Sequence, residues 1–446
     1  MTTSLDLAGI GIGPFNLSLA AHLDQIDSVE TRFFDRTSRL AWHPGMMLPG
    51  VELQTSFLKD LVTATNPTSP WSFMAYLVAQ KRFYEFLNAD FSAIPRQEFA
   101  SYLAWVGENL SSLRFGREVE EVNFDGADFT LRIDGETVRA RNLSVAVGLS
   151  PNIPGWAQSA YGERCFHNTQ AAQRLERLKA GRIAVVGGGQ SGAEVVLHLL
   201  SSERFSASEI EWISMRPNFL PLDDSPFTDE LFTPQYVESF HALPHRRRET
   251  ILDQQILAGD GASTSTLRAL YRRLYMIRHL SEDGMSVNLA PHREVLSVTR
   301  DGDEFQLIMR NGFDGAIEAR TFDAVVLATG YAFAVPDCMS LLLDRIELDE
   351  RGNYRLNASF EVDWNGPADR RIYALNAGRL SHGIAEPQLS LMAWRSAVIV
   401  NSLLGRNHFD LDLPDSPVAW ASRHSGTARS FEYSDRRARR RDASTG

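Results

Sequence analysis

Apolar and polar positions divide the chain into short buried strands separated by helices and loops. The apolar run 5–10 predicts a buried strand, and 31–35 predicts a second strand that ends in a carboxylate. Apolar residues at helical spacing predict helices over 72–87, 97–110 and 264–279. Further strands are expected over 118–124, 128–133, 142–147, 182–186, 209–216, 322–331 and 371–376, and a turn leading into a helix over 382–400. This order predicts an α/β fold.

A glycine-rich turn follows the first strand. It has the pattern Gly9-x-Gly11-x-Gly13-Pro14 and precedes a helical run, which is the order of the first βα turn of a dinucleotide-binding domain. Glycines there let backbone N–H groups approach a pyrophosphate at the helix N-terminus. Pro14 takes the last position of the pattern and tolerates the first helical turn. Asp35 is expected to accept hydrogen bonds from a ribose. The alternative is a tight turn without a nucleotide.

A second unit of the same kind begins at the next glycine-rich turn. An apolar strand is followed by Gly187-x-Gly189-x-x-Gly192 and a helix. The strand over 209–216 then ends in Arg216 rather than in a carboxylate. An arginine at this position suits the 2′-phosphate of NADPH, so NADPH is favoured over NADH. The alternative is an arginine that is merely solvated.

Two glycine-rich units predict two bound dinucleotides, FAD and NADPH, with hydride transfer between them. We expect an FAD-binding domain over 1–172 and 322–420, and an NADPH-binding domain over 173–321 with a substrate-pocket insertion at 220–280. Residues 421–446 are expected to form a disordered basic tail. The fold is thus predicted to be two Rossmann-like domains with a small substrate-binding region.

Composition excludes several classes of protein. The net charge of −11 over 446 residues argues against nucleic-acid binding. Cys165 and Cys338 are far apart, so a C-x-x-C disulfide reductase and a Cys-rich metal site are both unlikely on sequence grounds. His43 and His382 lack partners at metal-ligand spacing, and no metal is expected. A first strand so near Met1 and an apolar stretch interrupted by Arg395 predict a cytoplasmic protein without a membrane span.

Six short motifs occur in order between about Leu5 and about Leu413, namely 11–18, 42–45, 53–61, 186–193, 328–331 and 382–390. Together they resemble the flavin-dependent lysine/ornithine N-hydroxylases of hydroxamate siderophore biosynthesis. The last motif and its continuation 391–396 are more similar to the lysine-type branch. This resemblance implies that FAD, NADPH and O2 convert an amine to a hydroxylamine through a C4a-hydroperoxyflavin, as part of iron acquisition.

The resemblance also implies roles for particular residues. Gln54 is similar to a glutamine beside the flavin, and Ser390 to a pocket serine near the reacting amine. Lys59 is similar to the lysine that binds a substrate carboxylate. Asp229 stands where ornithine-type members carry an asparagine, and a carboxylate there suits a second ammonium. The remaining expected cofactor-binding residues are Trp42, His43, Gln190, Ser191, Thr329, Gly330 and Leu389.

The sequence leaves the amine open. Asp229 slightly favours a free diamine such as cadaverine or putrescine, while L-lysine and, as an alternative, L-ornithine also fit. Another class B flavin monooxygenase is a rival, but the F-x-G-x-x-x-H motif of ketone-oxidising enzymes does not fit 166–170. A non-catalytic redox flavoprotein is a second rival. A homo-oligomer, dimer or tetramer, is expected.

Overall fold

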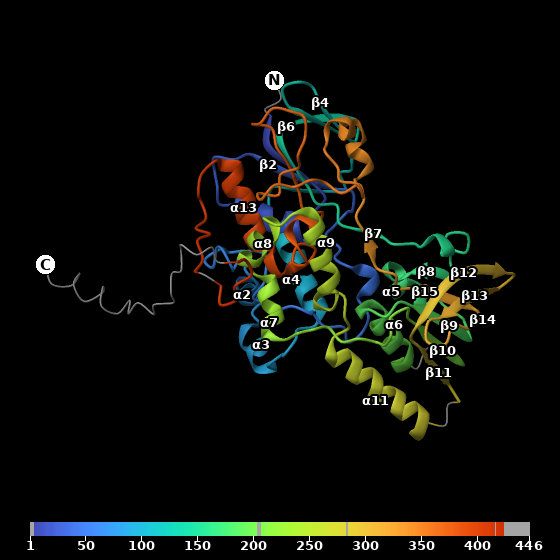
Figure 1. The fold of residues 1–446 in the computed structure, drawn as a ribbon. Helices are drawn as coiled ribbons and strands as arrows, with labels where there is room; N and C mark the ends of the chain where they lie inside the picture. The colour runs from blue at the N-terminus through green and yellow to red at the C-terminus, as the bar shows by residue number, and fades with distance from the viewer. Residues whose placement is uncertain (1–3, 203–206, 282–283, 415, 423–446) are drawn as a thin grey trace. The chain divides into compact units, whose positions relative to one another are not determined.

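The computed structural model describes residues 4–202, 207–281, 284–414 and 416–422. The helices and strands all lie in the first of two compact units, Met1–Asp412 and Leu413–Gly446. Most of the basic tail expected at 421–446 lies outside the described residues. The α/β fold itself is confirmed (Figure 1).

The first sheet is built around β1, the strand expected at the start of the chain. Its order is β3-β2-β1-β6-β5-β4, and β17 also pairs with β6. The strand bounds are β1 Leu5–Ile10, β2 Thr31–Asp35, β3 Leu113–Phe115, β4 Val119–Phe124, β5 Phe129–Ile133, β6 Glu136–Val145 and β17 Ile372–Ala374. Strands β1, β2, β3, β6 and β17 pair in parallel, whereas β4 and β5 pair in antiparallel fashion. Because the parallel strands end at one edge, that edge brings Gly11, Asp35 and Asn376 to the same side of the sheet.

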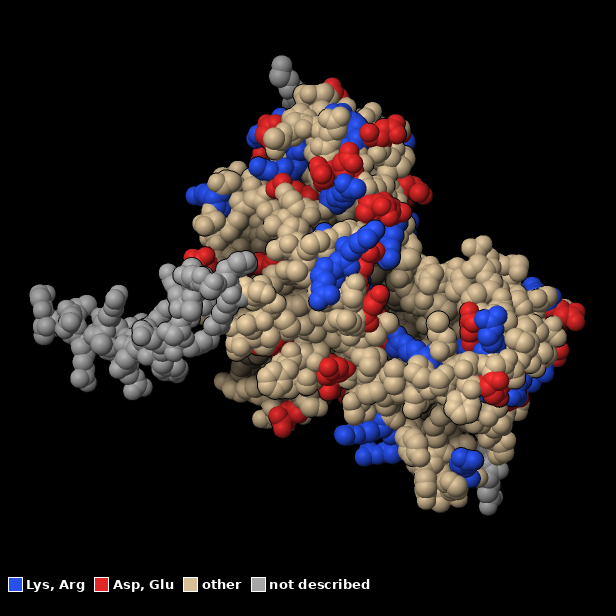
Figure 2. Space-filling view, in the orientation of Figure 1, with Lys and Arg blue, Asp and Glu red and all other residues tan. Residues whose placement is uncertain are grey.

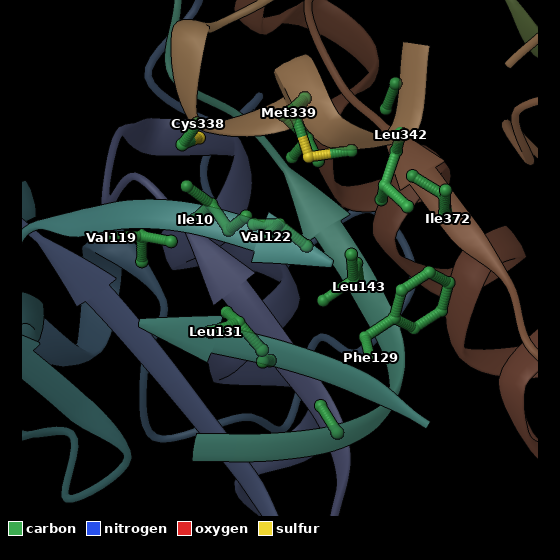
Figure 3. Packing of buried hydrophobic residues seen from close by; sticks show 14 of the residues in the cluster. Ile10, Val119, Val122, Phe129, Leu131, Leu143, Cys338, Met339, Leu342 and Ile372 are labelled. Atoms are coloured by element: carbon green, nitrogen blue, oxygen red, sulfur yellow. The ribbon is translucent and has the colours of Figure 1, made fainter. Parts of the chain in front are cut away.

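One face of this sheet is covered by η5 (Asp337–Arg345). Figure 3 shows Met339 and Leu342 of η5 above Val122 and Leu143 of the strands, with Ile372 beside them. All five side chains are fully buried. The packing fixes β17 against the sheet and therefore places the segment that follows it.

The second sheet is entirely parallel, with the order β11-β10-β9-β15-β8. Helices α6 (Gln190–Ser201) and α11 (Thr264–Leu280) pack on one face. A separate antiparallel sheet, β12-β13-β14, packs on the other face. The strand bounds are β8 Cys165–His167, β9 Arg182–Val186, β10 Glu209–Ile213, β11 Ser286–Ala290, β12 Arg293–Asp301, β13 Glu304–Asn311, β14 Ile317–Phe322 and β15 Ala324–Leu327.

The strand pairing divides the two sheets at other positions than the two expected domain boundaries. Strands β8 and β15 belong to the second sheet, although the boundaries at 172 and 322 assigned both to the FAD-binding part. The chain passes between the sheets at β7 (Ser150–Pro151) and β16 (Tyr331–Ala332), which pair with each other. Val326 of β15 pairs with Phe166 of β8, and both side chains are fully buried. A strand that is buried on both faces is apolar throughout and fits either sheet, so its sequence does not specify which sheet it joins.

The remaining helices also depart from the pattern in one place. The helix expected over 72–87 is two helices, because Lys81 adopts the left-handed conformation with φ 62°. The other bounds are α1 Pro14–Leu23, α2 Phe73–Ala79, α3 Phe83–Ala89, α4 Arg96–Asn109, α5 Ala171–Leu175, α7 Pro226–Asp229, α8 Pro234–His241, α9 His245–Gln254, α10 Ile256–Gly259, α12 Arg379–His382 and α13 Met392–Leu404. None of the helices in the described ranges is long and apolar enough to cross a membrane.

Candidate active site

The first glycine turn lies at the end of β1. Gly11 has φ +84°, and a Cβ there would stand 2.6 Å from the carbonyl oxygen of Ala146. Gly13 is the N-cap of α1 and its Cβ position is open, with Ala146 O at 4.0 Å. Pro14 is the first helical residue, as expected. The turn therefore leaves space in front of a helix N-terminus, which suits an anionic group.

The pattern of this turn differs from the expectation at two positions. Gly9 lies within β1, where a Cβ would stand 2.0 Å from the Phe33 ring, so it is a packing glycine in the strand. The residue three positions after the N-cap is Asn16, and this residue rather than Pro14 closes the pattern. Asn16 is fully buried, and its Nδ2 donates to the carbonyl of Gly11 at 2.8 Å. The sequence feature that could have identified Asn16 is its polar side chain within an otherwise apolar helical run.

Asp35 ends β2 beside this turn. Its Oδ2 accepts from the Ile12 N–H at 2.7 Å, and its Oδ1 accepts from the Thr37 N–H at 2.8 Å. The carboxylate is partly exposed. These bonds hold it against the glycine turn, where a ribose of a bound dinucleotide would lie.

The second glycine turn follows β9 and precedes α6. Gly187 has φ +134°, and a Cβ there would stand 2.0 Å from the Ala328 carbonyl. Gly189 is the N-cap, and a Cβ at Gly192 would stand 2.1 Å from the Gly187 carbonyl. Ser191 follows on the helix and is partly buried. Gly187 and Gly192 are thus needed for the close approach of helix and strand, whereas a Cβ at Gly189 would make only an ordinary contact, 3.6 Å from the Asp260 carbonyl oxygen.

Arg216 follows β10 and lies beside this second turn. Its Cδ is 3.8 Å from the Cβ position of Gly188, and its Nη1 donates to the Asp260 carbonyl at 2.6 Å. The side chain of Asp260 in turn pairs with Arg379 at 3.2 Å. The guanidinium is therefore held next to the turn by a neutral acceptor, so its charge is available to a phosphate.

Gln190 has its side-chain amide occupied by protein partners. Its Oε1 accepts from the Ser263 N–H at 2.7 Å, and its Nε2 donates to Glu194 at 2.8 Å. Glu194 also receives a bidentate pair of bonds from Arg96, at 3.0 and 2.6 Å, and both charged side chains are largely buried. Sequence reasoning missed this ion pair because its partners are 98 positions apart.

Thr329 and Gly330 lie where the chain crosses between the sheets. Thr329 Oγ1 donates to the Asn152 carbonyl at 2.6 Å, and the Gly330 carbonyl accepts from the Asn152 N–H at 3.0 Å. His167 Nε2 also contacts this carbonyl at 2.9 Å. These bonds hold the two crossing segments together.

Trp42 and His43 occupy a loop that packs against α4 and against the residues just before α5. The Trp42 ring packs edge-on against Phe99 at 5.6 Å, and His43 has φ 47°. A Cβ at the neighbouring Gly45 would stand 1.7 Å from the Thr169 carbonyl. The loop is thus packed closely against residues just before α5.

The four residues expected to meet the substrate come from three parts of the chain, because Gln54 and Lys59 share the loop before α2 while Asp229 ends α7 and Ser390 lies before α13. Gln54 and Asp229 are exposed, whereas Lys59 and Ser390 are partly buried. Leu389 and Ser390 belong to the short 3-10 helix η6 (Leu389–Leu391). Asp60, next to Lys59, is buried and accepts from the Thr63 and Phe73 N–H groups at 2.7 and 2.6 Å. In the described ranges, no hydrogen bond or ion pair joins any two of the four side chains.

A cleft of about 360 Å³ opens next to the crossing segments. Its walls come from α9, α10, the crossing segment at Tyr331 and the stretch 376–387 after β17. Figure 2 shows Lys and Arg side chains gathered near the centre of this face, in the region of α9, whose sequence begins His-Arg-Arg-Arg. Asn376 lines the cleft, and its buried Oδ1 has no hydrogen-bond partner among the described residues. An unused acceptor thus belongs to a residue of the cleft wall.

Comparison with known proteins places the chain in a family. Residues 3–333 match the family L-lysine 6-monooxygenase/L-ornithine 5-monooxygenase. The chain is 39% identical over 424 residues to the L-lysine N6-monooxygenase of Escherichia coli, covering 95% of this chain and 100% of that protein.

Two solved structures are also similar. The cadaverine monooxygenase DfoA of Erwinia amylovora, bound to FAD, gives a TM-score of 0.89 at 29% identity, with 95% and 100% of the two chains covered. The ornithine N-hydroxylase of Kutzneria sp. 744, with reduced FAD, NADP+ and L-ornithine, gives 0.84 at 27% identity, with 90% and 99% covered. The chain therefore belongs to the L-lysine 6-monooxygenase/L-ornithine 5-monooxygenase family of flavin- and NADPH-dependent N-monooxygenases.

Proposed function

We propose that this chain N-hydroxylates the terminal primary amine of L-lysine or of a linear diamine, cadaverine or putrescine, for siderophore biosynthesis. The observation that carries the proposal is the 39% identity to a lysine enzyme over all of that enzyme's length. The similarity to a cadaverine enzyme at a TM-score of 0.89 supports the diamine as the second candidate. L-Lysine and cadaverine share one carbon chain and differ by the α-carboxylate.

We assign FAD to the first glycine turn and NADPH to the second. The open position at Gly13 and the unpartnered Asn376 Oδ1 suit a pyrophosphate and a hydroxyl donor of FAD. Gly189 caps α6 beside Arg216, which suits the 2′-phosphate of NADPH. FAD, reduced by NADPH, supplies the activation of O2 that transfers one oxygen atom to the amine.

The amine must be neutral to act as a nucleophile, although the pKa of an alkylammonium is about 10 in water. A site that excludes water lowers that pKa, because desolvation disfavours the ammonium. We assign Lys59 to the substrate carboxylate and Asp229 to the ammonium that does not react. Gln54 and Ser390 are assigned to the reacting end. Lys59 can move toward a substrate, since in the described residues its side chain makes no hydrogen bond or ion pair.

An amine screen tests the proposal. L-Lysine, L-ornithine, cadaverine, putrescine and diaminopropane are each incubated with FAD and NADPH, and the hydroxylamine product is measured. We expect product from L-lysine or from a diamine. NADPH oxidation without hydroxylamine from any of the five amines would contradict the proposal.

Two substitutions then separate the two substrate types. If L-lysine is the substrate, Lys59→Ala should raise its KM about 10- to 150-fold, the equivalent of a charge-assisted bond of about 1.5–3 kcal/mol. If a diamine is the substrate, Asp229→Asn should impair turnover more than Lys59→Ala does. Lys179→Ala and Asp224→Asn are matched controls, because both residues are exposed. Equal effects of a substitution and its control would contradict the assigned role.

A homo-oligomeric state and a cytoplasmic location remain predictions of this proposal. Sedimentation of the purified chain and fractionation of cells test them directly.

A further inference from the structure

A buried ion pair lies behind the wall of the cleft. Arg395 on α13 and Glu386 after α12 are both 1% exposed at the side chain, with Nη1 3.3 Å from Oε1. Arg395 Nη2 also donates to the Glu386 carbonyl at 2.5 Å. Burying two charges costs several kcal/mol per ion unless their partners compensate, so such a pair is weak evidence for a role in stability alone.

The pair joins three segments, and one of them is the start of α1, directly after the first glycine turn. Glu386 Oε1 accepts from the Asn376 N–H at 2.7 Å, just after β17. Asn376 has φ 59°, a conformation that a single well-placed acceptor helps to hold. The Arg395 guanidinium stands 4.4 Å over the ring of Phe15, the second residue of α1. Glu386 and Asn376 both line the cleft.

The pair is not fully satisfied by the protein. Glu386 Oε2, Arg395 Nε and Arg395 Nη1 are buried and have no hydrogen-bond partner among the described residues. A small cavity of about 10 Å³ borders both side chains and is otherwise lined mainly by apolar and aromatic groups such as Phe360 and Trp394. A group kept only for stability would more often have its bonding capacity filled.

We propose that Arg395 and Glu386 are positioning residues for the flavin, resting on the assignment of FAD to the first glycine turn. Arg395 holds Glu386, and Glu386 holds the backbone of Asn376, whose unpartnered Oδ1 belongs to a residue of the cleft wall. The contact of Arg395 with Phe15 ties this wall to the helix that begins at the turn. Neither charged residue needs to touch the flavin.

The test compares FAD affinity with stability. Apo-protein is titrated with FAD by fluorescence to give Kd, and the thermal midpoint of the apo-protein is measured separately. Arg395→Met should lower the midpoint, because Glu386 loses its partner, and should raise the FAD Kd at least tenfold. The double variant E386L/R395M removes both charges, so its midpoint should recover. Its FAD Kd should stay raised, because Asn376 still lacks its acceptor.

Arg370→Met is the matched control. Arg370 Nε pairs with Asp128 at 3.1 Å and lies at the opposite end of β17. It should lower the midpoint without changing the FAD Kd. Should R395M not fold, R395K keeps the charge but loses the planar contacts, and it should raise the FAD Kd about three- to tenfold.

An unchanged FAD Kd in R395M or R395K, or full recovery of the Kd in the double variant, would overturn the proposal. No amine is present in these titrations. A wild-type chain that binds FAD but hydroxylates no amine would therefore contradict only the proposed function, whereas a wild-type chain that does not bind FAD would contradict both.

Discussion

The two glycine turns share one backbone geometry, but different residues stabilise it in each turn. In each turn the first glycine has a positive φ, and a carbonyl from a neighbouring strand's end occupies the place of its Cβ, Ala146 O for Gly11 and Ala328 O for Gly187. In each turn the carbonyl of that first glycine also needs a donor. Asn16 Nδ2 supplies it in the first turn, and Trp212 Nε1 supplies it in the second at 2.8 Å.

The choice of donor changes what the third position of the pattern can be. With an indole from β10 as donor, the third position must be Gly192, since a Cβ would collide with the Gly187 carbonyl. With the donor on the helix itself, the third position is Asn16, which also accepts from Ser144 Oγ at 2.6 Å. The glycine pattern therefore identifies a backbone geometry, and any residue that satisfies the same carbonyl can complete it.

The largest effect is expected at Gly11, in the turn to which we assign FAD. Gly11→Val should abolish FAD binding, because the side chain meets the Ala146 carbonyl and fills the space of the pyrophosphate. The visible flavin spectrum of the purified protein measures this. Gly50→Val is the control, because Gly50 has φ +77° but no atom within 4 Å of its Cβ position. A full flavin spectrum in Gly11→Val would contradict the expectation.

The helices after the two turns each carry a histidine, His22 on α1 and His198 on α6. The contribution of each histidine to stability should depend differently on pH in the acid range. Burial lowers the pKa of His22 to about 4, against an opposing bond to the Ser18 carbonyl. A neutral buried histidine contributes stability above pH 6.5 that is lost as the pH falls toward 4, amounting to about 3 kcal/mol. Denaturant unfolding of His22→Gln should therefore show a smaller loss over this range than the wild-type chain.

His198 on α6 provides the comparison. Burial also lowers the pKa of His198, and the Glu176 carboxylate opposes the shift. This side chain is only partly buried, so His198→Gln should change the acid dependence less than His22→Gln. The reverse order would show that burial of His22 is not the cause.

Arg216, which follows β10, should distinguish NADPH from NADH. Arg216→Ala should raise the KM for NADPH by about 10- to 150-fold, the equivalent of about 1.5–3 kcal/mol, and leave the KM for NADH nearly unchanged. Arg310→Ala, at an exposed pair with Glu294, is the control. Equal changes for NADPH and NADH would show that Arg216 does not contact the 2′-phosphate.

The smallest expected effect is the loss of stability when either donor to a glycine carbonyl, Trp212 or Asn16, is replaced. Trp212→Phe keeps the ring beside Phe219 but leaves the Gly187 carbonyl without its indole donor, at a cost of about 1–3 kcal/mol. Asn16→Leu removes a donor and an acceptor and should lie at the upper end of that range. Denaturant unfolding measures both. A smaller loss in Asn16→Leu than in Trp212→Phe would contradict the comparison.

Local pattern was sufficient for the turns and most strands, because those depend on residues close in sequence. The bounds of β1 and β2 agree with the expected runs, whereas β8 and β15 were placed in the wrong half because an apolar strand does not specify its sheet. Arg395 was visible as a charge within an apolar helix, but its partner Glu386 depends on how the loop after α12 folds back. The roles of Lys59 and Asp229 stay predictions, since they depend on a bound substrate.

The Arg96–Glu194 pair has a consequence for how the molecule unfolds. Arg96 begins α4, which packs with α1 of the first sheet, while Glu194 belongs to α6 of the second sheet. If either half unfolded alone, a charge that is now paired and buried would be left without its partner in the half that stayed folded. Partial unfolding is therefore penalised, and the two nucleotide-binding halves should melt as one cooperative unit, although each has a hydrophobic core of its own.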